Sequence, residues 1–228
     1  MQSSAPLFVL ASRSPRRLEL LSQIVPIDAI RVLPPVSSDE AGFDGLRSLV
    51  DVETRLTEIA AAKCGDVLRQ LGDEGTGSVV IAADTVVVAG EREHLAVLGQ
   101  PPEASWRETT RHWFSTYYAG RAHSVLTGLC VSTRSGLKQR IVTTQVTFRE
   151  DVAALLDWYL DTEEPRGKAG GYAIQGAGSL FVERIEGSLT NVIGLPLREL
   201  FEVLDEAGVA MDNRPRNGTR SQPNLQRR

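Results

Sequence analysis

The sequence predicts an α/β fold built on a mixed sheet, and three patterns lead to this conclusion. A short apolar run at residues 7–11 is followed at once by polar residues and a helical pattern, which predicts a strand, a loop and a helix. Residues 79–89, VVIAADTVVVA, are almost continuously apolar, as in a strand covered on both faces. Alternating segments on both sides of Ser135-Gly136 predict an antiparallel hairpin.

The length of 228 residues fits one domain of generous size, or two lobes that share a cleft. With 42% hydrophobic and 24% charged residues, the chain has an ordinary globular composition and can bury a sizeable core.

The first half of the chain contains four predicted elements. The strand at residues 7–11 is followed by a helix for which Ser14 is a natural N-cap and Pro15 a natural first residue. An apolar stripe from Leu49 to Leu71 predicts a long helix that ends at Gly72. The valine-rich strand at residues 79–89 follows a glycine-rich loop.

The second half continues the alternation of helices and strands. Aromatic residues at helical spacing between residues 106 and 117 predict a helix, and we assign these aromatics to the core. The hairpin strands are expected at residues 124–133 and 139–149. Further predictions are a helix at 152–160 that stops before Pro165, a strand at 181–185, and a last helix that Pro196 opens and that runs to Leu204.

Charge and composition exclude several classes of protein. The net charge is −4, but the segment from Asp212 to the end carries +4, so the remainder carries −8. Such an acidic body predicts no nucleic-acid binding. No apolar run approaches the roughly 20 residues of a membrane span, and no signal peptide is recognisable, so we expect a cytoplasmic protein without a membrane partner. Cys64 and Cys130 are expected to be buried, reduced thiols. Residues 208–228 are interpreted as a basic, disordered tail.

The hexapeptide SRSPRR, residues 12–17, is the most unusual local pattern. It places Arg16 and Arg17 in the first turn of a helix, where the dipole disfavours cations unless an anion lies between them. Backbone N–H groups, a serine hydroxyl and two guanidinium groups at one point together form a phosphate site. The alternative is a pair of solvated arginines on a surface helix.

Two further charged residues lie in apolar surroundings. Asp84 interrupts the valine-rich strand, where a carboxylate is costly unless it meets a cation or lies at a cleft. At the end of VVIAA it would hold a divalent metal or polarise a water; alternatively it belongs to a turn. Lys63 lies on the apolar stripe of the long helix and either reaches an anion site or extends its ammonium to solvent.

Loop residues add further candidates. Asp39 and Glu40 follow the second expected strand and either ligate a metal or lie in solvent. Lys168 precedes AGGYAIQG and supplies a cation beside a flexible backbone, and Gln175 supplies an amide suited to the edge of a base.

Other catalytic classes lack their signatures. There is no P-loop, no GxGxxG after the first strand and no GxSxG. The three histidines lack metal-ligand spacing, and neither cysteine has a convincing histidine partner. The remaining cations and carboxylates suit metal-assisted attack of water on a phosphate ester or anhydride.

Together these residues resemble the Maf family of nucleotide pyrophosphatases, over about Leu7 to Leu204. The resemblance is carried by four ordered motifs, namely LASRSPRRLELL at residues 10–21, AADTVV at 82–87, GRAHSVLTGLCV at 120–131 and KAGGYAIQGAGSLFVERIEGSLTNVIGLPL at 168–197.

The resemblance implies an α/β fold with two lobes around a deep nucleotide-binding cleft, with residues 1–207 as the catalytic domain. It implies hydrolysis of a nucleoside triphosphate to the monophosphate and pyrophosphate with Mg²⁺ or Mn²⁺, often by a homodimer. Asp84 would be the catalytic and metal-binding carboxylate, with Glu40 as a partner on the metal side. Phosphate-binding residues would be Ser12, Arg16, Arg17 and Lys63. Arg16, Thr85 and Gln175 match the family branch that acts on dTTP and UTP.

One segment departs from the family pattern. The family usually has Leu-Gly-Lys-Pro after the central hairpin, and this chain has Leu98-Gly99-Gln100-Pro101, so Gln100 stands where a phosphate-binding lysine is expected. This change supports a second hypothesis, in which the chain is a catalytically weak, nucleotide-binding regulator of cell division.

Overall fold

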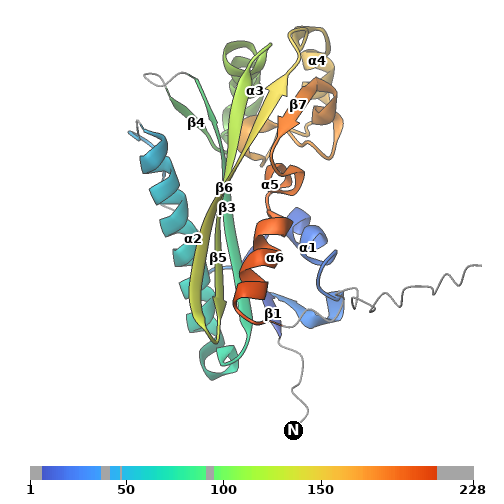
Figure 1. The fold of residues 1–228 in the computed structure, drawn as a ribbon. Coiled ribbons are helices and arrows are strands. Elements are labelled where there is room, and N and C mark those ends of the chain that lie inside the picture. The colour runs from blue at the N-terminus through green and yellow to red at the C-terminus, as the bar shows by residue number, and fades with distance from the viewer. Residues whose placement is uncertain (1–6, 37–41, 47, 91–94, 210–228) are drawn as a thin grey trace, which may run out of the picture.

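The computed structural model describes residues 7–36, 42–46, 48–90 and 95–209. Its centre is a twisted seven-stranded sheet with the strand order β2-β1-β3-β5-β6-β7 and with β4 paired to β3 (Figure 1). Strand β1 (Phe8–Leu10) pairs in parallel with both β2 (Ile30–Val32) and β3 (Val79–Ala89). The remaining pairs are antiparallel, so the predicted mixed sheet is confirmed.

Most of the predicted elements are present with small shifts of their ends. The helices are α1 (Pro15–Leu21), α2 (Leu49–Leu71), α3 (Trp106–Trp113), α4 (Ala153–Asp161), α5 (Leu189–Ile193) and α6 (Leu197–Glu206), with a π-helical turn at Phe114–Tyr118. The other strands are β4 (Ala96–Leu98), β5 (Ala122–Thr133), β6 (Gly136–Phe148) and β7 (Val182–Glu186). The sequence analysis missed β4 and α5, which are only three and five residues long.

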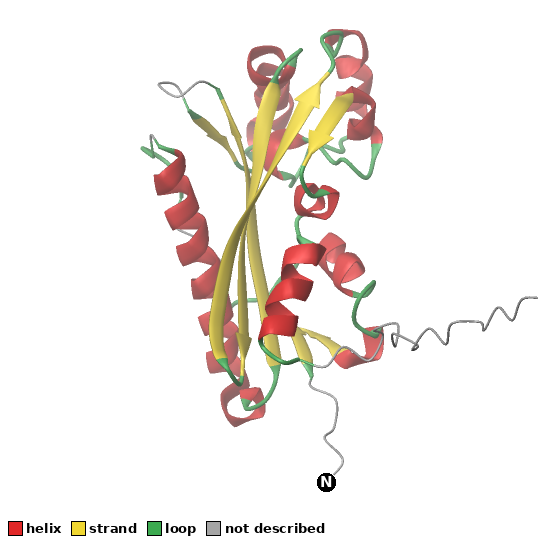
Figure 2. Cartoon of the chain, viewed as in Figure 1, coloured by secondary structure: helices red, strands yellow, loops and turns green. Residues whose placement is uncertain are grey.

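Strands β3, β5 and β6 are long and run through both halves of the molecule (Figure 2). At one end of the sheet, α2 covers one face, and α1 and α6 cover the other (Figure 1). At the opposite end, α3, α4 and the π-helical turn enclose an aromatic core that contains Phe114, Tyr118 and Phe148. The chain therefore has two lobes that share continuous strands.

Asp84 lies in the middle of β3, where it pairs with Gly128 of β5. The expectation that a strand ends at this carboxylate, and the alternative that it belongs to a turn, are both wrong. The strand continues because its second half, residues 86–89, is also buried: Val87 and Ala89 pack in the aromatic core of the other lobe, and Val86 and Val88 pack against α2. Asp84 and Thr85 are the only positions of β3 that are not fully buried, which puts them at the junction of the two lobes.

Helix α2 packs very closely on β5 at Gly128. A Cβ atom at this position would lie 2.6 Å from the carbonyl oxygen of Leu56 and 2.9 Å from its carbonyl carbon. Only a glycine allows the helix backbone to approach the strand so closely. This contact sets the depth at which α2, and with it Lys63, lies against the sheet.

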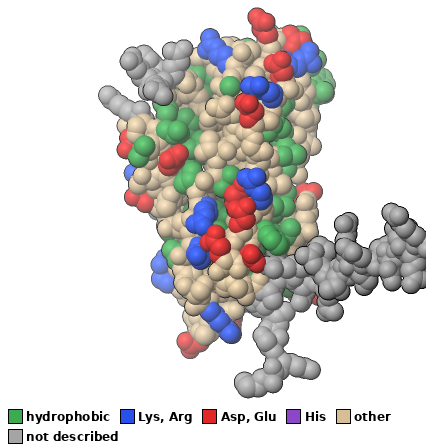
Figure 3. Space-filling model, viewed as in Figure 1, with side chains coloured by type: hydrophobic (Ala, Val, Ile, Leu, Met, Phe, Trp, Pro, Cys, Tyr) green, Lys and Arg blue, Asp and Glu red, His purple; other side chains and the backbone are tan. Residues whose placement is uncertain are grey.

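Four other predictions concern the whole chain. Cys64 and Cys130 are buried, free thiols, as expected. In the described part of the chain, no helix is both long and apolar enough to cross a membrane. The predicted tail, from residue 210 onward, lies outside the described residues. Basic and acidic side chains are interspersed on the face drawn in Figure 3, and the absence of nucleic-acid binding stays a prediction.

The contact at Gly128 generates a stability prediction. Gly128→Ala should destabilise the protein by about 1–3 kcal/mol or more, because the methyl group meets backbone atoms that move only with the whole helix. Gly65→Ala in the same helix is the matched control, since the nearest atom outside the helix backbone is 3.7 Å away on a flexible arginine. It should be neutral or stabilising by up to about 1 kcal/mol. Urea unfolding of both variants measures this, and equal stabilities would contradict the proposed packing.

Candidate active site

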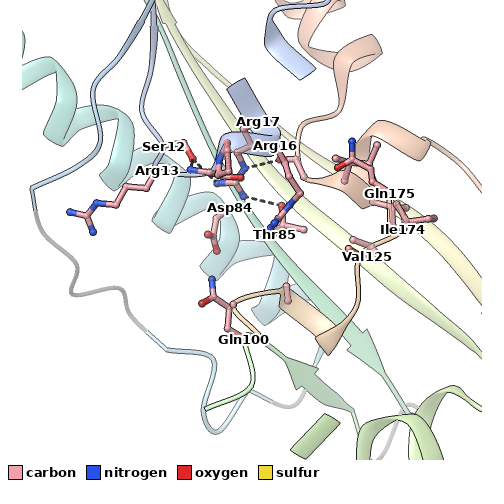
Figure 4. A pocket seen from close by; sticks show the side chains of 18 of the residues that line it. Ser12, Arg13, Arg16, Arg17, Asp84, Thr85, Gln100, Val125, Ile174 and Gln175 are labelled. Carbon is pink, nitrogen blue, oxygen red and sulfur yellow. Dashed lines mark hydrogen bonds between the residues drawn. The ribbon is translucent and has the colours of Figure 1, made fainter. Parts of the chain in front are cut away.

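A cleft of about 560 Å³ opens at the junction of the two lobes (Figure 4). Its wall is formed by the loop and first turn of α1, the middle of β3, the segment after β4, the glycine-rich segment 167–175 and the end of α5. Eight of the predicted site residues line it, namely Ser12, Arg16, Arg17, Lys63, Asp84, Thr85, Gln100 and Gln175. Segments far apart in sequence thus converge on one cavity.

The lining is strongly cationic although the protein as a whole is acidic. Arg13, Arg16, Arg17 and Lys63 face the cleft, and Asp84 is the one carboxylate among its lining residues in the part of the chain that the structure describes. Cations concentrated in a concave site raise the local concentration of anionic ligands. The cleft is therefore suited to a ligand that carries several negative charges.

Lys63 and Asp84 form an ion pair at the floor of the cleft. The Lys63 Nζ lies 2.7 Å from Asp84 Oδ1, and both side chains are only 14% exposed. Lys63 reaches the strand because it lies on the inner side of α2, so the alternative of an ammonium extended to solvent is wrong. No described residue donates a hydrogen bond to Oδ2 of Asp84.

Arg17 connects three parts of the site. Its Nε donates to the carbonyl oxygen of Gly194 at 2.8 Å, Nη1 to Ser12 Oγ at 3.3 Å and Nη2 to Thr85 Oγ1 at 3.1 Å. Thr85 Oγ1 is also 2.9 Å from Thr127 Oγ1 on β5. Arg17 thus ties α1 to β3 and to the turn after α5, and its donors are directed at protein acceptors. That it also contacts phosphate stays a prediction.

Arg16 has a different environment from its neighbour. It lines the cleft and is half-buried, and burial lowers the pKa of its guanidinium. Within the described chain it makes no hydrogen bond and no ion pair. Lys168 is close enough for mutual repulsion, since burial and then the charge of Arg16 lower the pKa of the lysine. A partly desolvated cation without a carboxylate partner is stabilised by an anionic ligand.

The loop before α1 is ordered by Ser12 and not by the expected N-cap. Ser14 occupies the N-cap position, but its side chain makes no capping hydrogen bond. Instead the N–H of Ser14 donates to Ser12 Oγ at 3.1 Å, and the same oxygen accepts from Arg17. The buried Ser12 therefore shapes the loop beside Arg16.

One of the predicted site residues that the structure describes does not line the cleft. Lys168 is not among the lining residues, because its Nζ donates to the carbonyl oxygen of Glu164 at 2.5 Å. Glu40, with Asp39, lies outside the described residues. Their roles stay predictions.

Gln100 enters the cleft from the segment after β4 (Figure 4). If a nearby arginine occupied the space of the missing lysine, Arg92 and Arg107 would be the candidates, and Arg92 lies outside the described residues. The guanidinium of Arg107 instead donates to the carbonyl oxygen of Leu160 and pairs with Asp161, and Arg107 does not line the cleft. Arg107 therefore does not replace the lysine that the family has at this position.

Several residues of the site were not found by the sequence analysis. Arg13 lines the cleft, and its Nη2 donates to the carbonyl oxygen of Pro35; its position inside SRSPRR was the available signal. Val125, Tyr172 and Val192 form apolar wall, and nothing in their local sequence distinguishes them from core residues.

The side chains that line the cleft fit one of the common ways in which proteins bind a divalent cation. Among the described residues, no group of three or more His, Cys, Asp or Glu side chains could hold a metal ion. Mg²⁺ in nucleotide sites is commonly held by one or two carboxylates together with substrate phosphates and water. Among the described lining residues, the single carboxylate Asp84, within a cavity suited to an anion, fits this mode.

The fold and cleft define a class: an α/β protein with a polyanion site at the junction of two lobes that share long strands. Residues 7–207 match the model of the family described as Maf-like protein, so the chain belongs to the Maf family.

Curated relatives agree with this membership. A dTTP/UTP pyrophosphatase of Anaeromyxobacter sp. (strain Fw109-5) is 41% identical over 206 residues, 88% of this chain and 89% of the relative. Proteins of the same name from Nitrobacter winogradskyi and Brucella abortus are 40% and 39% identical, over 89% and 88% of this chain and 92% and 91% of theirs.

Among solved structures, a nucleoside-triphosphatase (dITP/XTP pyrophosphatase) of Mycobacterium abscessus matches with a TM-score of 0.35 and 11% identity. The match covers 63% of this chain and 74% of that one, and a similarity at this level carries no argument.

A buried histidine lies directly behind the cleft wall. His123 is 3% exposed, and its Nε2 is 2.8 Å from the hydroxyl of Tyr172, which lines the cleft. Burial lowers the pKa of His123 from 6.5 to about 3. The imidazole is therefore neutral at neutral pH and does not exchange protons there.

This pKa shift predicts a pH dependence of stability. Between pH 6.5 and about 3 the unfolded chain binds a proton at His123 and the folded protein does not, so stability falls as the pH falls, by at most about 1.4 kcal/mol per unit. In His123→Gln, the loss of unfolding free energy between pH 6.5 and 4.5 should be smaller by about 2 kcal/mol. Urea titrations at both pH values measure it, with the exposed His112→Gln as control. Equal losses in wild type and His123→Gln would contradict the shift.

Proposed function

We propose that this chain hydrolyses dTTP and UTP to the monophosphate and pyrophosphate. The observation that carries the proposal is the half-buried Arg16, without a described protein partner, in a cationic cleft next to the Lys63–Asp84 pair. Membership of the Maf family and the names of the relatives support the same activity. No covalent nucleophile lies among the proposed groups, so the attacking group is water.

The phosphate chain would lie along the cationic side of the cleft. Arg16 offers a planar guanidinium that matches phosphate oxygens in a bidentate manner. Arg17 supports this side through its bonds to Ser12 and Thr85, which keep the loop before α1 in place. Charge on the triphosphate would relieve the repulsion between Arg16 and Lys168.

Asp84 would act on the water. To release pyrophosphate, the water oxygen bonds to the α-phosphorus, the bond from that phosphorus to the bridging oxygen breaks, and pyrophosphate leaves with the bond electrons. Asp84 accepts the proton of the water and later passes it to solvent. Lys63, at 2.7 Å from Oδ1, orients the carboxylate.

A divalent cation, Mg²⁺ or Mn²⁺, would be held by Asp84 together with phosphate oxygens, with Glu40 as the proposed second carboxylate. Bound there, it would neutralise charge on the phosphates as the leaving group departs.

The base would lie against the opposite wall, where Gln175 is at the rim and Val125, Tyr172 and Ile174 are apolar. Uracil and thymine present the O4 acceptor and the N3–H donor, and the amide of Gln175 offers one donor and one acceptor. Thr85 contributes indirectly, since its hydroxyl is already bonded to Arg17 and Thr127. Adenine and cytosine, with an amino donor and a ring-nitrogen acceptor in these places, would leave the amide unpaired, which costs roughly 1–3 kcal/mol per group, and guanine, which shares the acceptor and donor of uracil, would be rejected by its larger size.

The second candidate function is a nucleotide-binding regulator of cell division with weak catalysis. Gln100 is the observation that favours it, since an uncharged amide stands where the family has a lysine. Both functions require nucleotide binding, and only the first requires turnover.

A pyrophosphate-release assay with Mg²⁺ distinguishes the two functions. The proposed enzyme should release pyrophosphate from UTP and dTTP with a kcat/KM at least about tenfold above that for GTP and ATP. Calorimetric binding of UTP without product at high protein concentration would instead support the regulator. Equal kcat/KM values for UTP and GTP would contradict the proposal that pyrimidine nucleotides are the preferred substrates.

Asp84→Asn tests the catalytic carboxylate. The amide keeps the shape and some hydrogen bonding but cannot accept a proton, so kcat should fall by about 100-fold or more. The fold and the affinity for UTP should stay largely intact. Circular dichroism and calorimetry provide the controls, and a folded variant with wild-type kcat would refute the role of Asp84.

Gln100→Lys tests the departure from the family pattern. A charge-assisted hydrogen bond to phosphate is roughly twice as strong as a neutral one, so kcat/KM for UTP should rise by about fivefold. The gain should shrink at higher salt, because Gln100 is exposed to solvent. An unchanged or lower kcat/KM at two salt concentrations would mean that the site does not lack this charge.

A further inference from the structure

Glu164 contacts both flanks of the glycine-rich segment that carries Gln175. This segment, residues 167–175, supplies six lining residues of the cleft: Gly167, Ala169, Tyr172, Ala173, Ile174 and Gln175. It begins three residues after Glu164 and contains no α-helix or strand. Gly167, Gly170 and Gly171 have positive φ angles, so the segment follows a path that few other sequences adopt.

The carboxylate of Glu164 holds the end of this segment. Its Oε2 accepts from the N–H of Ala177 and its Oε1 from the N–H of Gly178, both at 2.9 Å. Oε1 also accepts from the hydroxyl of Tyr159 at 3.0 Å. Burial, followed by the charge of Glu164, raises the pKa of Tyr159, so this phenol stays a donor.

The backbone of Glu164 holds the beginning of the segment. Its carbonyl oxygen accepts from Lys168 Nζ at 2.5 Å. The turn between the two ends is equally constrained, because the N–H of Gly176 donates to the carbonyl oxygen of Ala173. Gln175 lies inside this turn, one residue before Gly176.

Gly176 packs directly on the carboxylate. A Cβ atom at residue 176 would overlap Glu164 Oε2 and lie 2.7 Å from its carboxyl carbon. The glycine therefore leaves just enough space for the carboxylate of Glu164, and a larger residue at position 176 would displace it.

From these contacts we propose that Glu164 is a positioning residue that sets nucleobase selectivity by fixing the backbone that carries Gln175. The proposal rests on the proposed function, in which Gln175 contacts the base. Glu164 itself does not line the cleft and would not touch the nucleotide.

Glu164→Gln is the direct test. The amide can still accept from Gly178 and Tyr159, but its NH₂ group then meets the N–H of Ala177, and two donors face each other. The carbonyl contact with Lys168 is unchanged. We expect the ratio of kcat/KM for UTP to that for GTP to fall about tenfold, mainly through a higher KM for UTP. Hydrogen exchange of the amides of residues 177 and 178 should become faster.

Two further variants provide a second test and a matched control. Gly176→Ala displaces the same carboxylate without removing its charge, so it should reproduce both effects even if Glu164→Gln does not fold. Glu163→Gln is the matched control, because Glu163 is an exposed neighbour that pairs only with Arg166 in the described structure. It should leave both the ratio and the exchange rates unchanged.

Combination with Gln175→Ala separates failure of this proposal from failure of the proposed function. Gln175→Ala alone should lower the UTP:GTP ratio, and Glu164→Gln added to it should not lower the ratio further. If Gln175→Ala lowers the ratio and Glu164→Gln does not, the positioning role is overturned and the function stands. If Gln175→Ala leaves the ratio unchanged, the base contact in the proposed function is wrong and the selectivity role of Glu164 falls with it. Unchanged exchange at residues 177 and 178 would show that the carboxylate does not hold the turn.

Discussion

The ion pair between Lys63 and Asp84 is the interaction on which the rest of the site depends. An ionised carboxylate in the middle of a buried strand is very costly without a partner. The partner comes from α2, 2.7 Å away, and α2 can approach this closely because Gly128 has no side chain facing Leu56. A backbone contact in the core therefore determines whether the carboxylate in the cleft is tolerated.

The continuity of β3 places that carboxylate between two cores. Residues on both sides of Asp84 and Thr85 are buried, with Ile81 and Ala83 in one core and Val87 and Ala89 in the aromatic core, and Asp84 and Thr85 are the two positions of β3 that are not fully buried. The two consecutive arginines, Arg16 and Arg17, point in different directions. Successive residues of a helix point about 100° apart, so Arg17 faces Thr85 and Gly194 while Arg16 faces the cavity. One arginine connects the elements and the other is available for a ligand.

The opposite wall follows a different principle. The segment 167–175 contains no strand or α-helix, and hydrogen bonds hold it: those of Gly170 to Gly99 and Tyr118, that of Tyr172 to His123 and, at its flanks, those of Glu164. Glycines permit the tight backbone turns of this wall, and the hydrogen bonds keep Gln175 in one position. The phosphate side is thus supported by helix and strand packing, and the base side by hydrogen bonds to neighbouring elements and, at its flanks, to Glu164.

Local patterns were enough to predict the mixed α/β class, the long helix, the hairpin and the last helix, because apolar periodicity and Gly or Pro boundaries are local properties. They also indicated Asp84, Lys63 and the arginine pair, since charges in apolar or dipole-disfavoured positions stand out locally. Four features became visible only in the three-dimensional packing: β3 continues past Asp84, Arg17 bonds to Thr85 and Gly194, Lys168 bonds to a carbonyl oxygen, and Glu164 bonds to the backbone of residues 177 and 178. These contacts join residues whose local sequence looks ordinary, and Arg17 and Gly194 are 177 positions apart. Their partners are chosen by the packing of two lobes on shared strands, which no local pattern encodes.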